Sequence, residues 1–222
     1  GYEAAKERFP VPVISVIGPG IPMACKTTRN NRVGLIGTKG TVESHAHADI
    51  FAALNPDIQV FGQACPLLPT LIELGRIDSD ETRQVIETYL TPLMEQGIDT
   101  LLLGCTHFPF VVELIRDVLG PGVGIVDPNG DLVQELKTAL TDMNHLRGGI
   151  ADRGEHRFIV SRFPDTFQQV GSMLLGWPIP RVEEIPVGKA VEGFAIRERD
   201  LYNPDMKPDL QELLKGGATN TR

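Results

Sequence analysis

The sequence predicts an α/β protein built on parallel, doubly wound sheets. Short apolar runs alternate with amphipathic segments along the chain, as expected when each parallel strand is followed by a covering helix. The run over residues 98–103 is largely aliphatic, which is typical of a strand covered on both faces. Hydrophobic residues make up 41% and charged residues 23% of the 222 residues, values that suit a globular protein with a real core.

In the first half of the chain, the ends of the apolar runs predict where the helices and strands end. Glycine and proline separate the runs and predict the turns between them. In order, we expect a helix over 2–9, a buried strand over 11–17, a short helix over 21–28, a strand over 33–38, a helix beginning near Thr41 and a strand over 59–64.

The second half continues the alternation. Ser79 precedes a long amphipathic segment and is a good helix cap. Around that helix we expect a short helix over 66–74, a strand ending just before Cys105, a helix over 110–119, a strand over 123–127, a helix over 131–140, a strand over 158–161 and a helix over 164–175.

Composition excludes several classes of function. The net charge of −8 and the pI near 5.1 argue against nucleic-acid binding, which needs clustered Lys and Arg. No apolar run approaches the roughly 18–20 residues of a membrane span. The three cysteines are an odd number and lie 40 residues apart, so they predict no disulfide framework and fit a reducing cytoplasm.

The strongest local signal for chemistry follows the strand over 98–103. Cys105 and His107 flank Thr106 there, and Gly104 lets the chain turn. Open α/β sheets bind ligands at this carboxyl edge, and a thiol beside an imidazole can act as nucleophile and base or as a proton-transfer pair. A helix starting near Pro109 would point its N-terminus at the sulfur, so we expect a lowered pKa for Cys105. A buried structural cysteine beside a capping threonine fits the same pattern.

Two threonines mark a second strand end. Thr38 closes the strand over 33–38 and Thr41 begins the next helix, so their hydroxyls and the free N–H groups there can hold a carboxylate or a phosphate. A simple helix cap explains the same residues. The spacing is not that of a P-loop.

Glu73 and a histidine pair are weaker signals. Glu73 lies in an otherwise apolar stretch, where it either faces solvent or lines a cleft. His45, His47 and Asp49 raise the possibility of a metal site, but two histidines two residues apart share a face only in an extended segment, and this segment is predicted to be helical. No cysteine pair has CxxC spacing either, so we expect no metal site.

Five ordered motifs together resemble the glutamate racemases of the aspartate/glutamate racemase superfamily. The motifs are VPVI from Val11, RVGLIGT from Arg32 with Thr41 and Ser44, ACPL from Ala64 with Glu73, DTLLLGCTHFP from Asp99, and Val126-Asp127. The similarity covers about residues 10–140, with a weaker echo over 158–175.

The resemblance implies a fold and a reaction. The fold would contain two pseudo-symmetric α/β domains, and the reaction would be racemisation of glutamate without cofactor or metal, by two cysteines on opposite faces of the α-carbon. Such an enzyme is cytoplasmic, supplies D-glutamate for peptidoglycan, and binds a small-molecule substrate rather than nucleic acid or membrane. A homodimer is its candidate assembly.

The resemblance also implies roles for individual residues of this chain. Cys105 matches the second cysteine of the family, His107 the neighbour that assists its proton transfer, and Glu73 a buried carboxylate that tunes or relays protons. The implied substrate-binding residues are Thr106, which matches a ligand to the amino acid, and Thr38 and Thr41, which match residues near the substrate carboxylate. His47 stands where relatives often have Tyr, so the mouth of the pocket is expected to differ.

The chain also departs from the family pattern. The opening Asp-Ser-Gly motif and the Ala-Cys-Asn-Thr motif with the first cysteine have no counterpart here. We therefore expect a racemase that lacks its N-terminal segment, with Cys25 as a packing residue. The expected domains are a remnant of the first domain over 1–16 and 141–186, a second domain over 17–140 carrying Cys105, and a polar tail over 187–222. Two alternatives stay open: a catalytically impaired remnant that only binds a ligand or partner, and an aspartate racemase.

Overall fold

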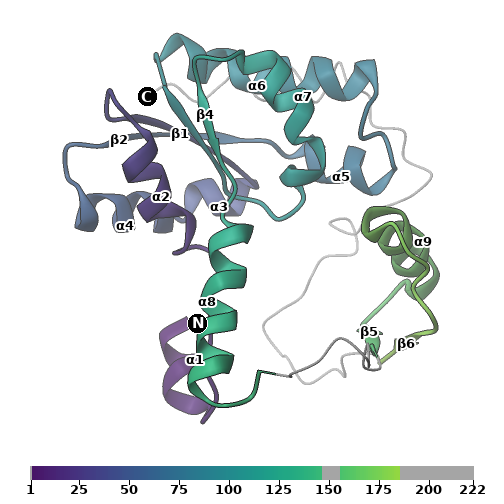
Figure 1. Ribbon diagram of the computed structural model, residues 1–222. Helices are drawn as coiled ribbons and strands as arrows, with labels where there is room; N and C mark the ends of the chain where they lie inside the picture. The colour runs from purple at the N-terminus through teal and green to yellow at the C-terminus, as the bar shows by residue number, and fades with distance from the viewer. Residues whose placement is uncertain (1, 147–155, 186–222) are drawn as a thin grey trace.

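A computed structural model of the chain describes residues 2–146 and 156–185, and its main body is one parallel sheet (Figure 1). The strands are β1 (Arg32–Gly37), β2 (Gln59–Ala64), β3 (Thr100–Leu103) and β4 (Gly124–Val126), in the order β2-β1-β3-β4. Every neighbouring pair is parallel. The chain therefore winds outward in both directions from the β1–β3 pair, and the predicted doubly wound α/β fold is confirmed.

Helices cover both faces of this sheet (Figure 1). The helices α2 (Gly20–Thr27) and α4 (Ala46–Leu54) pack on one face, and α5 (Leu67–Glu73), α6 (Asp80–Glu95) and α7 (Val112–Leu119) pack on the other. The short α3 (Lys39–Glu43) joins β1 to α4. The chain begins with α1 (Tyr2–Arg8), and α8 (Asn129–Asp142) leads away from the sheet after β4.

The side chains of β3 alternate between the two layers of the core, as expected for a strand that is buried on both faces. Leu101 and Leu103, 0% and 1% exposed, belong to the cluster under α5, α6 and α7. Leu102, 1% exposed, belongs to the cluster under α2 and α4. Successive side chains of a strand point to opposite faces, so this run fills both layers of the core.

The long helix α6 begins where the sequence predicts. The Ser79 side chain accepts a hydrogen bond from the backbone N–H of Thr82, which satisfies one of the free donors of the first turn. Asp80 and Glu81 add negative charge at that positive helix end.

One predicted element is wrong, and a second begins differently. Residues 11–17 form no strand: Val11 is 59% and Val16 54% exposed, and Pro12 has no N–H for a sheet ladder. The helix expected over 110–119 is delayed, because a 3-10 turn, η1 (Phe108–Val111), comes first and α7 begins only at Val112. The second difference bears on the chemistry of Cys105.

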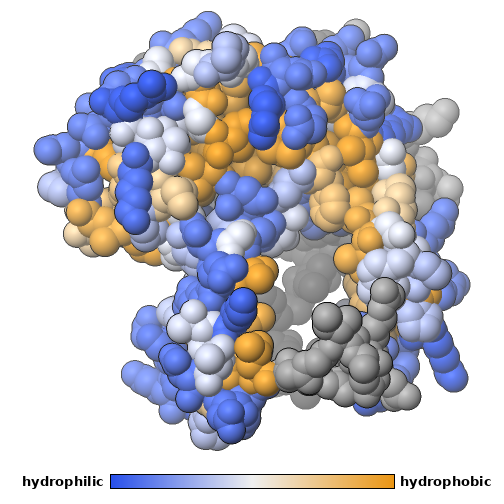
Figure 2. Space-filling model, in the orientation of Figure 1, coloured by the Kyte–Doolittle hydropathy of each residue, from blue (hydrophilic) through white to orange (hydrophobic). Residues whose placement is uncertain are grey.

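Outside the main body, the structure describes a small unit after residue 156. It consists of β5 (Phe158–Val160), α9 (Pro164–Leu175) and β6 (Val182–Glu184), and its two strands pair in parallel. Neither α8 nor α9 contains a buried residue, and both expose apolar side chains, such as Val133 at 58% and Met173 at 44%. Hydrophobic surface along α8 is visible in Figure 2.

The expected polar tail over 187–222 lies outside the described residues. None of the described helices is both long and apolar enough to cross a membrane.

One carboxylate ties the end of α2 to the start of β3. Asp99 accepts hydrogen bonds from the Thr28 hydroxyl at 2.6 Å and from the Thr100 hydroxyl at 3.0 Å. It also accepts from the backbone N–H groups of Arg29 at 2.6 Å and Asn30 at 2.8 Å. Burial alone would raise the pKa of Asp99, but these hydrogen bonds outweigh it and hold the pKa below the ordinary 3.8.

Replacing this carboxylate should weaken the fold in a pH-dependent way. We expect Asp99→Ala to lower the free energy of unfolding by about 1–3 kcal/mol at pH 7, since it leaves several donors unpaired. The stabilisation belongs to the ionised form, so it is present above the unfolded pKa and is lost as pH falls through the lower folded pKa. Urea unfolding of wild type and variant at pH 7 and near pH 3 measures both effects. The exposed Asp57→Ala is the control, and an equal loss in that variant would contradict the role of Asp99.

Candidate active site

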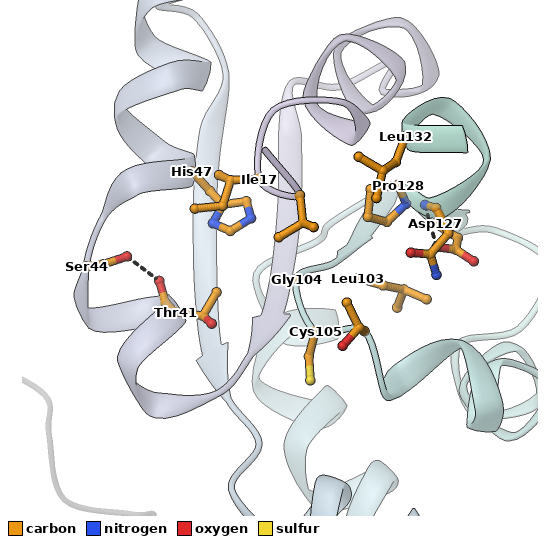
Figure 3. A pocket seen from close by; sticks show the side chains of 13 residues that line it. Ile17, Thr41, Ser44, His47, Leu103, Gly104, Cys105, Asp127, Pro128 and Leu132 are labelled. Atoms are coloured by element: carbon orange, nitrogen blue, oxygen red, sulfur yellow. Dashed lines mark hydrogen bonds between the residues drawn. The ribbon is translucent and has the colours of Figure 1, made fainter. Parts of the chain in front are cut away.

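A cavity of about 200 Å³ opens at the carboxyl edge of the sheet (Figure 3). The chain leaves β1 toward β2 on one side of the sheet and leaves β3 toward β4 on the other. The cavity lies at this switch point, which is where open α/β sheets bind ligands. Its walls come from four places: the segment before α2 (Val16, Ile17), α3 and α4 (Thr41, Ser44, His47), the turn after β3 (Leu103, Gly104, Cys105, Thr106) and the start of α8 (Asp127, Pro128, Asn129, Leu132).

The turn after β3 places Cys105 on the wall of the cavity. Gly104 makes this turn possible: its N–H donates to the carbonyl oxygen of Ile36 at 2.7 Å, and a Cβ at this position would lie 2.8 Å from that oxygen. Only glycine permits so close an approach of the two strand ends. Cys105 follows immediately and is half-buried.

The pKa of Cys105 is raised, which corrects the expectation of a lowered value. Burial of the thiol has the largest effect and raises the pKa. The backbone N–H groups of His107 and Phe108 act in the predicted direction and lower it, whereas the charge of Glu73 raises it further. A 3-10 turn follows the cysteine in place of the expected α-helix, and its few N–H groups do not offset burial.

Two side chains that do not line the cavity connect to Cys105 through close polar contacts. The Cys105 sulfur lies 3.8 Å from Nδ1 of His107, and Nε2 of His107 lies 3.0 Å from Oε1 of Glu73. The Glu73 side chain, on the last residue of α5, is 46% exposed rather than buried as the resemblance implied. The structure thus brings together the three residues expected to act on protons.

The expected binding threonines divide into two groups. Thr41 and Thr106 line the cavity, whereas Thr38 does not. Thr38 instead caps α3: its hydroxyl oxygen accepts from the Thr41 N–H at 3.2 Å and lies 2.9 Å from the Thr41 hydroxyl. Thr38 can therefore orient Thr41 while staying outside the cavity wall.

The other two thiols of the sequence, those of Cys25 and Cys65, do not line the cavity. Cys65 is 0% exposed in the core, and burial raises its pKa far above the ordinary value. Cys25, on α2, packs against the apolar cluster under α2 and α4, and burial raises its pKa as well. Of the three thiols, Cys105 is the one on the wall of the cavity.

The sequence placed His47 at the mouth of the pocket through the family resemblance but gave it no role, and it did not single out Asp127 as a site residue. Asp127 directly follows β4, so the rule that pointed to Cys105, a polar residue just after a strand, applies to it as well. His47 was considered for metal binding and as the position of a tyrosine. Among the described residues, no three His, Cys, Asp or Glu side chains gather into a metal-holding group.

Comparison with known proteins gives matches over most of the chain. The sequence profile of the Asp/Glu/hydantoin racemase family matches residues 1–136. The glutamate racemase of Syntrophus aciditrophicus is 40% identical over 183 residues, which are 82% of this chain and 67% of that protein. The glutamate racemase of Desulforudis audaxviator is 41% identical over 185 residues, or 81% of this chain and 68% of that protein.

Solved structures match the fold as well. A glutamate racemase isoform from Bacillus anthracis superposes with a TM-score of 0.76 at 32% identity, over 83% of this chain and 68% of that one. The glutamate racemase of Francisella tularensis, solved in complex with D-glutamate, gives a TM-score of 0.73 at 30% identity, over 82% of this chain and 67% of that one. These matches confirm the predicted resemblance and the predicted enzyme class, an amino-acid racemase. This chain belongs to the Asp/Glu/hydantoin racemase family.

Proposed function

We propose that this chain transfers protons at the α-carbon of glutamate, in a racemisation between the L and D forms without a cofactor, with Cys105 as one acid/base. One observation carries the proposal: Cys105 lines the cavity, and His107 and Glu73 stand in hydrogen-bonding sequence behind it. The names of the relatives and the D-glutamate in the Francisella tularensis structure support the choice of substrate.

The raised pKa of Cys105 defines how this residue would start each cycle. At neutral pH the thiol is protonated, which is the form that donates a proton to an α-carbanion. To remove an α-proton, the thiol must first lose its own. The Glu73 carboxylate lies 3.0 Å from Nε2 of His107, and we assign a proton to this nitrogen because a carboxylate accepts. In a neutral ring Nδ1 is then an acceptor 3.8 Å from the sulfur. His107 can therefore take up the thiol proton, and Glu73 stabilises the charge that then forms.

The substrate would be held by uncharged donors. Thr41 and Thr106 present hydroxyls on the cavity wall, from α3 and from the turn after β3 respectively. Donors of this kind can bind a carboxylate and stabilise the negative charge that spreads onto it when the α-proton leaves. Thr38 contributes by orienting Thr41.

From the family resemblance we propose the wider setting as well. The product D-glutamate would enter peptidoglycan precursors, the enzyme would act in the cytoplasm, and two copies would form a homodimer. Residues 17–140 would be the domain that carries Cys105, and residues 1–16 and 141–186 would belong to the other domain. The two-cysteine mechanism of the family would assign one face of the α-carbon to Cys105.

Replacing the thiol tests its role directly. We expect Cys105→Ser to slow exchange of the glutamate α-proton in D₂O by about 100-fold or more, since a serine hydroxyl is a far weaker acid at the same position. Loss of the α-proton NMR signal measures the rate. Cys25→Ser, on α2, is the matched control and should exchange at the wild-type rate. Equal rates in the two variants would remove Cys105 from the mechanism.

Glu73→Gln should move the titration of Cys105. The charge of Glu73 raises the pKa of this thiol, so its removal should lower that pKa and shift thiolate formation to lower pH. The rate of Cys105 alkylation by iodoacetamide, followed by mass spectrometry across a pH series, reports the shift. Glu87→Gln, an exposed change on α6, is the control. A midpoint that stays in place or rises would contradict the arrangement.

The two faces of the α-carbon should also behave differently. Because one thiol lines the cavity, a polypeptide of residues 1–222 should exchange the α-proton of one enantiomer and racemise at least ~100-fold more slowly than the Syntrophus aciditrophicus relative. Circular dichroism of D- and L-glutamate follows racemisation, and deuterium NMR follows exchange. Racemisation at the full rate would make Cys25 the candidate for the second acid/base.

A further inference from the structure

One buried polar side chain on the cavity wall has no hydrogen-bond partner. His47, near the start of α4, is 5% exposed, and its Nδ1 is fully enclosed with no hydrogen-bond partner among the residues that the structure describes. Its ring lies beside Ile17 on the wall of the cavity (Figure 3). Buried polar groups in folded proteins are normally hydrogen-bonded, so this one needs an explanation.

Packing alone does not account for a histidine here. One turn further along α4, Phe51 is 0% exposed and lies in the apolar cluster with Ile21 and Leu35. An apolar ring at position 47 would extend that cluster and leave no polar atom without a partner. The histidine gives up this packing advantage, which is typical of residues retained for a ligand.

The protonation state of the His47 ring determines which hydrogen bonds it can make. Burial lowers the pKa of His47, so the imidazole is neutral at pH 7 and carries one N–H. Nδ1 is enclosed with neither a donor nor an acceptor among the described residues, which leaves Nε2 as the ring nitrogen that can reach a ligand, and we place the proton there. His47 is then an uncharged hydrogen-bond donor.

The cavity wall makes such a donor useful. Among the described residues that line the cavity there is neither Lys nor Arg, and the acidic one is Asp127. The donors that this part of the wall offers to a negatively charged ligand are therefore neutral. Hydroxyls come from Thr41, Ser44 and Thr106, an amide comes from Asn129, and His47 adds an N–H from α4.

We propose that His47 is a substrate-binding residue whose Nε2–H donates a hydrogen bond to a carboxylate of the bound amino acid. This inference rests on the function proposed above, because it takes the ligand to be glutamate. It assigns to α4 a part in recognising the substrate, alongside the turn that carries Cys105. The hydrogen bond would form only with the substrate present.

Two substitutions at position 47 separate binding from packing. His47→Phe keeps a ring of similar size and removes the donor, and we expect it to weaken D-glutamate binding about 10-fold or more with no loss of thermal stability. His47→Gln places an amide N–H near the position of Nε2 and should bind within a few-fold of wild type. Titration calorimetry with D-glutamate gives the dissociation constants. Asp49→Asn, an exposed change on the same helix, is the control and should bind like wild type.

Histidine NMR of the wild-type protein gives a second readout that needs no variant. The ¹⁵N pattern of His47 should be that of a neutral ring protonated on Nε2, and its Nε2–H signal should shift when D-glutamate saturates the protein. The exposed His45 should not respond. If His47→Phe fails to fold, an unchanged His47 signal at saturation overturns the inference.

The outcomes distinguish this inference from the proposed function. If wild type and a folded His47→Phe variant bind D-glutamate equally tightly, His47 is not a binding residue, and the proposed function stands. If wild type does not bind D-glutamate at all, both proposals fail. Weaker binding in the phenylalanine variant alone, with the glutamine and asparagine variants close to wild type, supports the inference.

Discussion

The site depends on the pairing of β1 with β3. In this register Ile36 lies opposite Leu103, so both strands end at the same level. The 2.7 Å hydrogen bond from the Gly104 N–H to the Ile36 carbonyl then holds the turn after β3 against the end of β1. The chain leaves β1 toward α3 and leaves β3 toward η1, so side chains on the two segments face the same space. A shift in this register would separate the Thr41 hydroxyl from the Cys105 thiol.

Two opposing effects meet at Cys105, and their balance sets its resting state. The N–H groups of His107 and Phe108 stabilise a thiolate, whereas burial and the nearby Glu73 charge destabilise it, and burial has the largest effect. At rest Cys105 is therefore a protonated thiol, a weak acid, and not a preformed thiolate nucleophile. That state suits proton transfer in both directions, because a permanently ionised thiolate would be a poor proton donor.

Much of the fold could be predicted from the sequence because its signals are local. The aliphatic run before Cys105, the Ser79 cap and the alternation of strands and helices needed no tertiary information. The strand expected over 11–17 is wrong because apolar content does not reveal whether a neighbouring strand is there to pair with. The lowered pKa expected for Cys105 is wrong because burial of a thiol and the geometry of one turn depend on the packing around them. His47 stayed without a role for the same reason, since its enclosure is created by residues distant in sequence.

The two ends of β3 are tied to different partners. Asp99, at the amino end, anchors the segment after α2, and Cys105, just past the carboxyl end, lines the cavity. The four residues of β3, a length of roughly 13 Å, lie between them, and all four are buried. Evolution or an engineer can therefore strengthen or loosen the anchor at the amino end without disturbing the geometry around the sulfur.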